Sequence, residues 1–561
     1  MILFFDIEVF KFDWVIVAID PTKHEEYVFI NNREEFVNFY ESHKNYIWIG
    51  YNSRNYDQYI IKALLCEFNP FEVSKYIIAD KKPGYKFSRL LRKFPLNNYD
   101  VMTTFHSLKT LEGFMGNDIR ETTVSFDLNR QLTPLELSET VTYCRNDVTQ
   151  TMEVFLRRKS DFDAHLNIIK AFNLPLSAIN KTKAGITALA LGCQRIFFTD
   201  EWDISFVSTI KLDKYQYIFD WFKNPENYKN GEKFKTDVSG IPHVFGLGGI
   251  HGAATTPIHI KDFMVHIDVT SYYPSLMIEY DLLSRTVRDK RVFKAIYDKR
   301  VALKKAGKKK EQAPYKIILN STFGITNDKY SLAYDPRRNH EVTINGQLLL
   351  LDLLEKLEGC CELIQSNTDG IIIQTNNFER VKAICHEWEI RTKMGLGFDI
   401  ITELWQKDVN NYIFQFEDGK LERKGAYVKE LHSLDNDLPI VNNALVNYMT
   451  KGVPIEKTIY ECNELIMFQK IVKISNKYLY GLHNGERLND KTFRIFASTD
   501  QHDTTIYKVK NLDKNPEKFA IAPDHCFIDN SDIKGKKVPG KLDKGWYVQL
   551  CKRRLNDFGI T

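Results

Sequence analysis

Two acidic residues stand inside an apolar segment at the start of the chain. Residues 4–10 are typical of a buried strand, and within it Asp6 and Glu8 are two positions apart, so both project from one face. Buried like charges cost several kcal/mol unless a cation neutralises them. The pair therefore indicates a metal site, with a chance edge strand as the alternative interpretation.

Further residues of the same chemical type follow downstream. Asp57 comes shortly after the apolar segment 46–49, and Tyr143 and Asp147 are four positions apart on a predicted helix, where they share a face. Four acids and a tyrosine of this kind can hold two divalent cations and orient a water for in-line attack on a phosphodiester. Together they make a candidate hydrolytic site.

Another acid lies at the end of a predicted strand in the middle of the chain. The odd-numbered positions of segment 263–269 are apolar, so Asp268 points to the opposite face. Pro274 cannot continue a central strand but suits the first turn of a helix, which predicts a strand that breaks near Tyr273 and a helix over 275–280. A carboxylate at a strand end, followed by hydroxyl-bearing residues, can hold a hard cation and a phosphate. A structural surface aspartate is equally consistent with the pattern.

A basic segment follows this strand and has a helical spacing. Arg300 and Lys304 are four positions apart, and Lys316 and Asn320 share a face of a second predicted helix that is expected to stop at Gly324. Two antiparallel helices joined by a short basic tip would bring three cations together, which suits a triphosphate.

Two predicted hairpins and a glycine-rich segment carry the remaining polar candidates. Residues 363–373 form two apolar strands around an Asn-Thr-Asp-Gly turn, with Asp369 at the tip, although a plain surface hairpin would look similar. Residues 412–427 are typical of a hairpin that turns at an Asp-Gly pair. The glycines of segment 245–252 would let the backbone approach a ligand closely, or would simply form a tight turn.

The composition describes an ordinary globular chain of several domains. Its 561 residues predict three or four domains at ~100–200 residues each. Hydrophobic residues make up 43% and charged residues 27%, and no uncharged apolar run reaches the ~18 residues of a membrane span. Asp6 and Glu8 interrupt the apolar start before a secretion signal could form, so we expect no membrane association.

Charge and cysteine usage narrow the partners. The net charge of +4 conceals two basic clusters, with ten Lys or Arg against one Asp over 290–310 and eight against one over 534–554. Such clusters are usually solvated faces, but beside metal-type acids they favour a polyanion as the partner. Nine cysteines without metal-like spacing indicate reduced thiols in a cytosol and no zinc.

The acids of the first third of the chain resemble the three motifs of the 3′–5′ proofreading exonucleases found in DNA polymerases. The patterns Asp-x-Glu, Asn-x-x-x-Tyr-Asp and Tyr-x-x-x-Asp occur in that order. The resemblance implies that Tyr143 positions the attacking water. Some protein-primed relatives also use a lysine upstream of the third motif, but residues 116–121 contain none, so that role is unassigned. The metal-binding acids implied are Asp6, Glu8, Asp57 and Asp147.

The middle of the chain resembles the family B DNA polymerases. Asp-x-x-Ser-x-Tyr-Pro-Ser begins at Asp268, Lys-x-x-x-Asn-Ser-x-Phe-Gly begins at Lys316, and Asn-Thr-Asp-Gly ends at Gly370. With the exonuclease motifs, the resemblance covers nearly the entire chain. It implies that Asp268, Asp369 and the carbonyl of Val269 hold two Mg²⁺ ions, which Mn²⁺ can replace. The nucleotide-binding residues implied are Ser271, Tyr272, Tyr273, Arg300, Lys304, Lys316 and Asn320, and the DNA-binding residues are Phe245, Gly248, Gly249, Thr368, Lys424 and Tyr427.

The resemblance assigns one steric role, and the sequence departs from the family in several places. Tyr273 is expected to pack under the sugar and exclude a 2′-hydroxyl. Asn367 and Gly370 replace the usual first Asp and the Ser of the third polymerase motif, and Phe323 replaces a Tyr of the second. In the glycine-rich segment the family's tyrosine is out of register, because Gly246 occupies its place. Of the primer-holding Lys-Lys-Arg-Tyr element only the first and last members are present.

The implied fold is α+β and multidomain, with an RNase H-like exonuclease domain and a right-hand polymerase of palm, fingers and thumb. A boundary is expected in the polar segment 224–235. The expected divisions are 1–160 for the exonuclease, 161–237 for a helical linking region, 238–285 for the palm, 286–326 for short fingers, 327–430 for the rest of the palm, and 431–561 for a partly helical thumb.

The function expected is primer extension by two-metal phosphoryl transfer, with proofreading in a separate site. Primer-template DNA, deoxynucleotides and replication accessory proteins are the expected partners of a monomer in the cytoplasm of a phage-infected bacterium. Only 48 positions separate Asp268 from Lys316 and 49 separate Asn320 from Asp369, which leaves no room for protein-priming inserts and favours a minimal phage-type enzyme with an oligonucleotide primer. The alternatives are a catalytically inactive, polymerase-like DNA-binding scaffold, suggested by Asn367, and a 3′–5′ exonuclease without synthesis.

Overall fold

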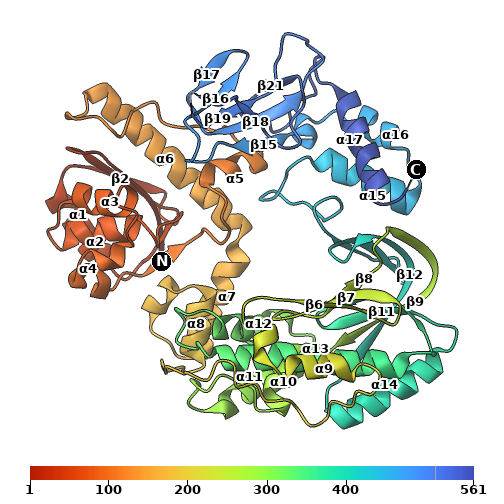
Figure 1. Ribbon diagram of the computed structural model, residues 1–561. Helices are drawn as coiled ribbons and strands as arrows, with labels where there is room; N and C mark the ends of the chain where they lie inside the picture. Colours follow the sequence, from red (N-terminus) through yellow and green to blue (C-terminus); the bar gives the residue numbers. More distant parts are fainter. Residues whose placement is uncertain (512, 561) are drawn as a thin grey trace. The chain divides into compact units, whose positions relative to one another are not determined.

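The chain folds into two compact units, each of mixed helices and strands (Figure 1). The computed structural model describes residues 1–511 and 513–560. The division after Lys181 falls ahead of the boundary expected at 224–235, and the residues beyond 430, expected as one domain, contribute to both units. The first unit comprises Met1–Lys181, Leu431–Val441 and Glu456–Gln549, and the second Thr182–Glu430, Asn442–Ile455 and Leu550–Thr561.

A five-stranded mixed sheet organises the N-terminal part of the first unit. β1 pairs antiparallel with β2 and parallel with β4, which is the arrangement that puts β1 in the middle. In spatial order the strands are β3 (Glu25–Ile30), β2 (Trp14–Asp20), β1 (Ile2–Val9), β4 (Ile47–Gly50) and β5 (Asn98–Asp100). The neighbouring helices are α1 (Arg33–His43), α2 (Asp57–Leu65), α3 (Pro70–Ile78), α4 (Arg89–Lys93) and α6 (Pro134–Arg157).

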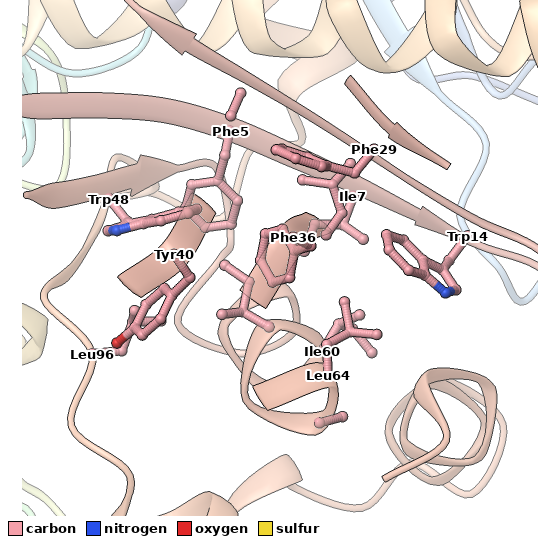
Figure 2. Close-up of a cluster of buried hydrophobic side chains, with 14 of the residues drawn as sticks. Phe5, Ile7, Trp14, Phe29, Phe36, Tyr40, Trp48, Ile60, Leu64 and Leu96 are labelled. Atoms are coloured by element: carbon pink, nitrogen blue, oxygen red, sulfur yellow. The ribbon is translucent and has the colours of Figure 1, made fainter. Parts of the chain in front are cut away.

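The two faces of β1 serve different purposes, because successive side chains of a strand point to opposite sides. Phe5 and Ile7 pack with Phe36 of α1, Trp48 of β4 and Ile60 of α2 in the apolar core drawn in Figure 2. Each of these five side chains is at most 3% exposed, so burial of this face supplies the hydrophobic stabilisation of the sheet.

The opposite face of β1 is covered by α6. Phe4 packs edge-on against Phe155 of α6, with ring centroids 5.1 Å apart. Asp6 and Glu8 share this side with Phe4, as their spacing predicted. The core on the first face therefore fixes the acids on the second.

The C-terminal part of the first unit contains two small sheets, so it is richer in strands than the partly helical domain expected there. Its three-stranded sheet is β15 (Lys470–Lys473), β18 (Thr492–Ala497) and β21 (Cys526–Ile528). The four-stranded sheet is β17 (Glu486–Leu488), β16 (Tyr480–His483), β19 (Tyr507–Val509) and β20 (Glu517–Lys518). Helical segments of this unit are η1 (Gly84–Lys86), α5 (Leu108–Met115), α7 (Lys159–Ala171), η2 (Leu176–Asn180) and η4 (Leu465–Phe468). The helices α15 (Pro439–Lys451), α16 (Ile455–Glu461) and α17 (Lys544–Asp557) straddle the division between the units.

A nine-stranded antiparallel sheet organises the second unit. Both hairpins expected from the sequence are present in it, β10–β11 around Thr368-Asp369 and β13–β14 around the Asp-Gly turn. In spatial order the strands are β14 (Leu421–Lys424), β13 (Asn411–Phe416), β12 (Leu396–Asp408), β9 (Ile258–Val269), β11 (Gly370–Gln374), β10 (Glu362–Asn367), β8 (His251–Ala253), β7 (Ile241–Phe245) and β6 (Phe234–Val238).

Helices gather beside this sheet, below it in the view of Figure 1. The central one is α13, whose residues from Asn339 to Leu354 are all buried, so this stretch of the helix has no exposed face. The helices of this unit are α8 (Lys183–Ala190), α9 (Gln216–Phe222), η3 (Pro225–Asn227), α10 (Tyr272–Glu279), α11 (Lys290–Lys305), α12 (Lys309–Thr326), α13 (Pro336–Leu357) and α14 (Phe378–Thr392).

The elements around Asp268 form as the sequence predicted, with one exception. β9 ends at Val269, α10 carries Pro274 in its first turn, and α11 and α12 are separate helices joined by a short basic turn. Gly324 does not stop α12. The helix continues to Thr326, and burial of Ile325 and Thr326 stabilises this last turn. The short helix α8 ends just before Gly192, which takes a left-handed φ of 63°.

Two further observations bear on the composition. No helix within residues 1–511 and 513–560 is both long and apolar enough to cross a membrane. All nine cysteines are free thiols, including the neighbours Cys360 and Cys361.

Candidate active sites

Four acids and a tyrosine come together on the α6 side of the first unit's sheet. Asp6 and Glu8 project from β1 and Asp147 from α6, and one carboxylate oxygen of each lies within 4.8 Å of the others. Asp57 is the first residue of α2 and is buried. Tyr143 lies one turn before Asp147 on α6. The set named from the sequence is therefore assembled from three separate segments.

The electrostatics of this cluster indicate a need for a cation. Burial raises the pKa of Asp6 to about 7, with the charge of Asp147 adding to the shift. Burial, followed by the charges of Asp6, Asp147 and Asp57, raises the pKa of Glu8, and burial also raises that of Asp57. The Oδ2 atom of Asp6 is buried and has no hydrogen-bond partner among the described residues. Carboxylate oxygens in this state are ligands suited to a hard divalent cation.

Lys109 is a member of this cluster that the sequence analysis missed. Its ammonium donates to Asp147 Oδ1 at 2.5 Å and to Glu112 Oε1 at 3.0 Å, and lies 4.7 Å from the ring centroid of Tyr143. The charges of Asp147 and Glu112 outweigh burial and raise the pKa of Lys109, so the side chain stays charged. Lys109 lies just ahead of segment 116–121, where the family resemblance predicted a lysine. A charged pair three positions apart on the otherwise apolar α5 is the signal that could have found it.

The C-terminal sheets of the first unit hold α5 in place. Arg494 of β18 is fully buried and donates to the carbonyl oxygens of Gly113 at 3.1 Å and Asn117 at 2.8 Å, at the carboxyl end of α5. A Cβ on Gly113 would lie 2.8 Å from Cδ1 of Ile471 on β15, so a larger residue would force that side chain to move. Through α5, Arg494 positions the ammonium of Lys109.

An apolar cavity of about 660 Å³ opens beside the same acids. Glu8 lies on its wall together with Tyr56, Phe71, Ile78 and Phe126. The hydroxyl of Tyr56 lies 2.8 Å from that of Ser74, which fixes the ring. A flat, apolar group such as a nucleobase would fit between these rings.

In the second unit, Asp268 lies near the end of β9, and Asp369 lies in the hairpin turn just before the neighbouring antiparallel strand β11. The Cα of Asp268 is opposite that of Gly370, and the backbone N–H of Val269 donates to the carbonyl of Asp369 at 2.8 Å. Burial, then the charge of Asp369, raises the pKa of Asp268 to about 7, and burial raises that of Asp369. Two acids a hundred residues apart in sequence thus share one site.

Both turns that follow or precede these acids contain a non-glycine residue in the left-handed region. Ser271 has φ 51° and Thr368 has φ 58°. Such conformations cost about 1–3 kcal/mol each and persist only where the surroundings impose them. The Ser271 hydroxyl accepts a hydrogen bond from Arg300 Nη1 at 2.8 Å. A Cβ on Gly249 would lie 2.5 Å from Thr368 Oγ1, so the glycine-rich segment packs directly on the Asn-Thr-Asp-Gly turn.

A cavity of about 380 Å³ adjoins Asp369. Tyr273 on its wall packs against Phe323 of α12, with ring centroids 4.3 Å apart. Arg300, Lys304 and Lys316 are not among its lining residues, although the charge of Lys304 partly offsets the rise in the pKa of Asp268. The lining brings together Ser271, Tyr272, Tyr273, Pro274, Leu319, Asn320, Phe323, Thr368 and Asp369.

On the other side of Asp369 lies a second cavity of about 420 Å³, which we name the sheet-floor cavity. Of its charged or titratable lining residues besides the two acids, Lys424 was named from the sequence as a DNA-binding residue, whereas His266 and Glu422 were not named. Asp399 lies close by, because its charge, like that of Glu422, raises the pKa of Asp268 after burial and Asp369. The lining residues are His266, Asp268, Gln365, Asn367, Thr368, Asp369, Gly370, Ile372, Tyr412, Phe414, Glu422 and Lys424.

Three residues named from the sequence are placed differently from the expectation. The Phe245 side chain is fully buried on β7, so its ring cannot contact DNA, because it fills the core beside His243. The hydroxyl of the buried Tyr272 donates to the carbonyl of Gly346, which leaves Tyr273 as the tyrosine that can face a nucleotide. Tyr427 donates to Asp557 Oδ2 at 3.0 Å, so a DNA contact would have to share its hydroxyl. Gly248 has open space around it, as a contact to a ligand requires.

Comparison with known proteins gives a limited result. No family model matches the chain, and no curated protein matches it. Among solved structures, the family B DNA polymerase from the hyperthermophilic archaeon Pyrobaculum calidifontis is similar to this chain at 14% identity, with a TM-score of 0.41 over 99% of this chain and 77% of that one. Because the TM-score is this low, the argument for function rests on the two sites themselves.

Proposed function

We propose that the chain is a template-directed DNA polymerase of family B with a separate 3′–5′ exonuclease site. The observation that carries the proposal is the meeting of Asp268 on β9 with Asp369 in the adjoining hairpin turn, where the Val269 N–H donates to the Asp369 carbonyl and the cavity beside Asp369 also takes in Tyr273 and Asn320. Two neighbouring carboxylates beside a cavity of this size suit transfer of a nucleotide to a primer 3′-hydroxyl. The six ordered motifs of the sequence support the same assignment.

The residues of both sites fit divalent cations. Asp268, Asp369 and the Val269 carbonyl would hold two Mg²⁺ ions, or Mn²⁺ in their place, for synthesis. Bound ions of this kind lower the pKa of a hydroxyl or water and offset charge on phosphate oxygens. For hydrolysis the holding residues would be Asp6, Glu8, Asp57 and Asp147. The buried Asp6 Oδ2 has no hydrogen-bond partner among the described residues, and oxygens of Asp6, Glu8 and Asp147 lie within 4.8 Å of one another, which fits the same cations.

The chain's own residues would bind and orient the nucleotide. Arg300, fixed by Ser271, and the exposed Lys304, Lys316 and Asn320 present donors from the facing helices α11 and α12 to a triphosphate. The ring of Tyr273 would support the sugar and exclude a 2′-hydroxyl by its bulk, since Phe323 prevents it from moving aside.

The chain's residues would also position a strand end for trimming. Lys109 and Tyr143 flank Asp147, so an ammonium and a hydroxyl stand beside the carboxylates where a water and a phosphodiester would meet. The apolar cavity beside Glu8 would take the base of the strand being trimmed. Lys109 would act on the substrate as a charged ammonium and would not give up a proton, because its two carboxylate partners keep it charged.

The finer assignments belong to the same proposal. Residues 1–160 would be an RNase H-like exonuclease domain, and the 238–285 and 327–430 segments would be a palm with fingers at 286–326 and a thumb beyond 431. The partners would be primer-template DNA, deoxynucleotides and replication accessory proteins, in phage genome replication. Gly248, Gly249 and Thr368 would contact template, and Lys424 and Tyr427 the primer.

A polymerase-like scaffold without synthesis is the second candidate, and Asn367 favours it. Its amide donates to the carbonyl of Val409 at 3.5 Å, which the usual aspartate could not do. The proposal of an active enzyme is preferred because Asp268 and Asp369 are both present and adjacent. An exonuclease without synthesis is the remaining alternative.

Paired inactivation tests the proposal. With a labelled primer on a longer template, Mg²⁺ and four deoxynucleotides, Asp369→Asn should reduce extension by at least about 10³-fold and leave trimming intact, whereas Asp6→Asn should do the reverse. The two variants control each other, because each retains the activity that the other loses. An unmodified protein that trims primers but never extends them, at any metal or nucleotide concentration, would exclude synthesis.

A further inference from the structure

The imidazole of His266 on β9 lies directly against Gly370 at the start of the neighbouring strand β11. A Cβ on Gly370 would lie 2.8 Å from His266 Nε2 and 3.1 Å from the carbonyl oxygen of Ile267. His266 is two residues before Asp268 on β9, so both side chains point to the same face. The imidazole therefore lies where any side chain at position 370 would have been.

The imidazole of His266 makes no hydrogen bond to any described residue. It is half-buried and lines the sheet-floor cavity. Lys424, which lines the same cavity, forms no salt bridge with any described residue, and its ammonium lies 5.7 Å from the ring centroid of Tyr412. Two N–H donors that line one cavity and have no acceptor among the described residues are available to bind a ligand.

The other polar side chains of the cavity already have partners. The amides of Gln365 and Asn367 donate to the carbonyl of Val409 at 3.4 and 3.5 Å. The hydroxyl of Tyr412 donates to Glu422 at 3.1 Å, and that of Thr368 to the Asn367 amide oxygen at 3.5 Å. Of the lining side chains in the described chain, His266 and Lys424 are left as the N–H donors that make no hydrogen bond.

The charges around the cavity define what these donors would bind. Asp268, Asp369, Asp399 and Glu422 face His266, and a phosphate that came near them would be repelled unless N–H groups stood in front. An imidazole presents an N–H in either protonation state, and an ammonium presents three. Two donors that line one cavity next to the reacting acids suit one phosphodiester group.

We propose that His266 donates a hydrogen bond to the 3′-terminal phosphodiester of the primer, in the cavity that Lys424 also lines, and that position 370 is glycine because the ring needs its space. This inference rests on the proposed synthesis function, since the primer end must lie beside Asp268 and Asp369 for its hydroxyl to react. It adds a primer-contacting residue outside the sequence motifs.

A neutral primer linkage tests the contact. The 3′-terminal phosphodiester is replaced by a methylphosphonate, which removes the charge and weakens the acceptor, and each diastereomer is extended separately. We expect kcat/KM of the unmodified protein to fall about tenfold or more. His266→Ala should lose a similar factor on the natural primer and nothing further on the neutral one, whereas a methylphosphonate five linkages upstream should leave the ratio between the two proteins unchanged.

The same measurement can overturn the proposal. If the losses from His266→Ala and from the terminal methylphosphonate multiply, or if His266→Ala extends the natural primer normally, the residue does not contact that phosphate. The melting temperature and circular dichroism spectrum of each variant show whether it is folded, and His266→Gln, which keeps an N–H donor, should recover part of the lost activity. If the unmodified protein extends none of these primers, the synthesis function itself is refuted.

The packing part of the proposal has its own test. Gly370→Ala should reduce extension more than His266→Ala does, because the added methyl displaces the ring and the strand. The double variant His266→Ala with Gly370→Ala should extend better than Gly370→Ala alone, though not fully, since the Ile267 carbonyl is also close. Equal activity of the single and double glycine variants would show that the two positions do not compete for space.

Discussion

The two acidic sites solve the same electrostatic problem in different ways. In the first unit Asp57 and Asp147 are 5% and 8% exposed, and Lys109 is bound directly to Asp147. In the second unit Asp369 is exposed at a hairpin tip, and the nearby cations Lys304 and Lys316 lie exposed on α11 and α12. The first site is preorganised by burial, and the second is open for a large charged substrate to complete.

Exchanging cations for neutral side chains should separate the two designs most strongly. Lys109→Met should reduce trimming about 100-fold through kcat, because the ammonium is fixed beside the reacting group, and should leave extension unchanged. Lys316→Met is the matched control, expected to raise the KM for deoxynucleotides and spare trimming. Steady-state kinetics of both reactions for both variants give the comparison.

A result in which Lys109→Met lowers trimming and extension alike would mean that the ion pair stabilises the unit rather than the reaction. The melting temperature of the variant distinguishes these outcomes. Lys109→Arg, which keeps the charge but changes its geometry, should recover stability before it recovers trimming.

Specificity should differ between the sites as well. Tyr273→Ala should reduce discrimination against ribonucleotides roughly 10- to 100-fold, since a ring held by Phe323 no longer blocks the 2′-hydroxyl. The measurement is the ratio of kcat/KM for a deoxynucleotide and the matching ribonucleotide. Phe323→Leu, which only loosens the ring, should give a smaller loss. Trimming of primers that end in a ribonucleotide should be unaffected, and a change there would argue against separate sites.

The smallest expected effect is on stability, and it follows from burial. The pKa of Asp6 is raised from 3.8 to about 7, so without divalent cations the folded state binds the extra proton and unfolding free energy falls as pH rises from about 4 to 7. At pH 8, Asp6→Asn should therefore be more stable than the unmodified protein by on the order of 1–3 kcal/mol. Asp369→Asn should change stability less, because the Asp369 side chain is only partly desolvated at the exposed hairpin tip.

Thermal melting at pH 5 and pH 8, with and without Mg²⁺, measures this difference. Saturating Mg²⁺ should raise the melting temperature of the unmodified protein more at pH 8 than at pH 5, because the acids must be ionised to bind it. An Asp6→Asn protein no more stable than the unmodified one at pH 8 would contradict the charge burden assigned to the first site.

Residues whose roles depend on neighbours in sequence were predicted well. The alternation before Asp268, Pro274 in the following helix, the paired helices of the basic segment and the Asp369 hairpin all appear as expected. Each is fixed by local rules of strand period, helix start and turn chemistry.

Residues whose roles depend on distant partners were missed or misplaced. Lys109 reads as part of an ordinary helix until α6 brings Asp147 to it, and Arg494 is unremarkable until β18 lies against α5. Phe245 was assigned to DNA by its place beside glycines, but the sheet buries it.

By itself the sequence determined which acids exist, on which face of which element they lie, and the order of the motifs, because periodicity is a property of the local backbone. Only the tertiary structure decided that Asp268 lies beside Asp369, that Lys109 forms an ion pair with Asp147, and that His266 packs against Gly370. These pairs are set by strand register and helix packing between residues that are tens to a hundred positions apart in sequence. The burial that shifts the pKa values of these side chains arises only when each unit has folded.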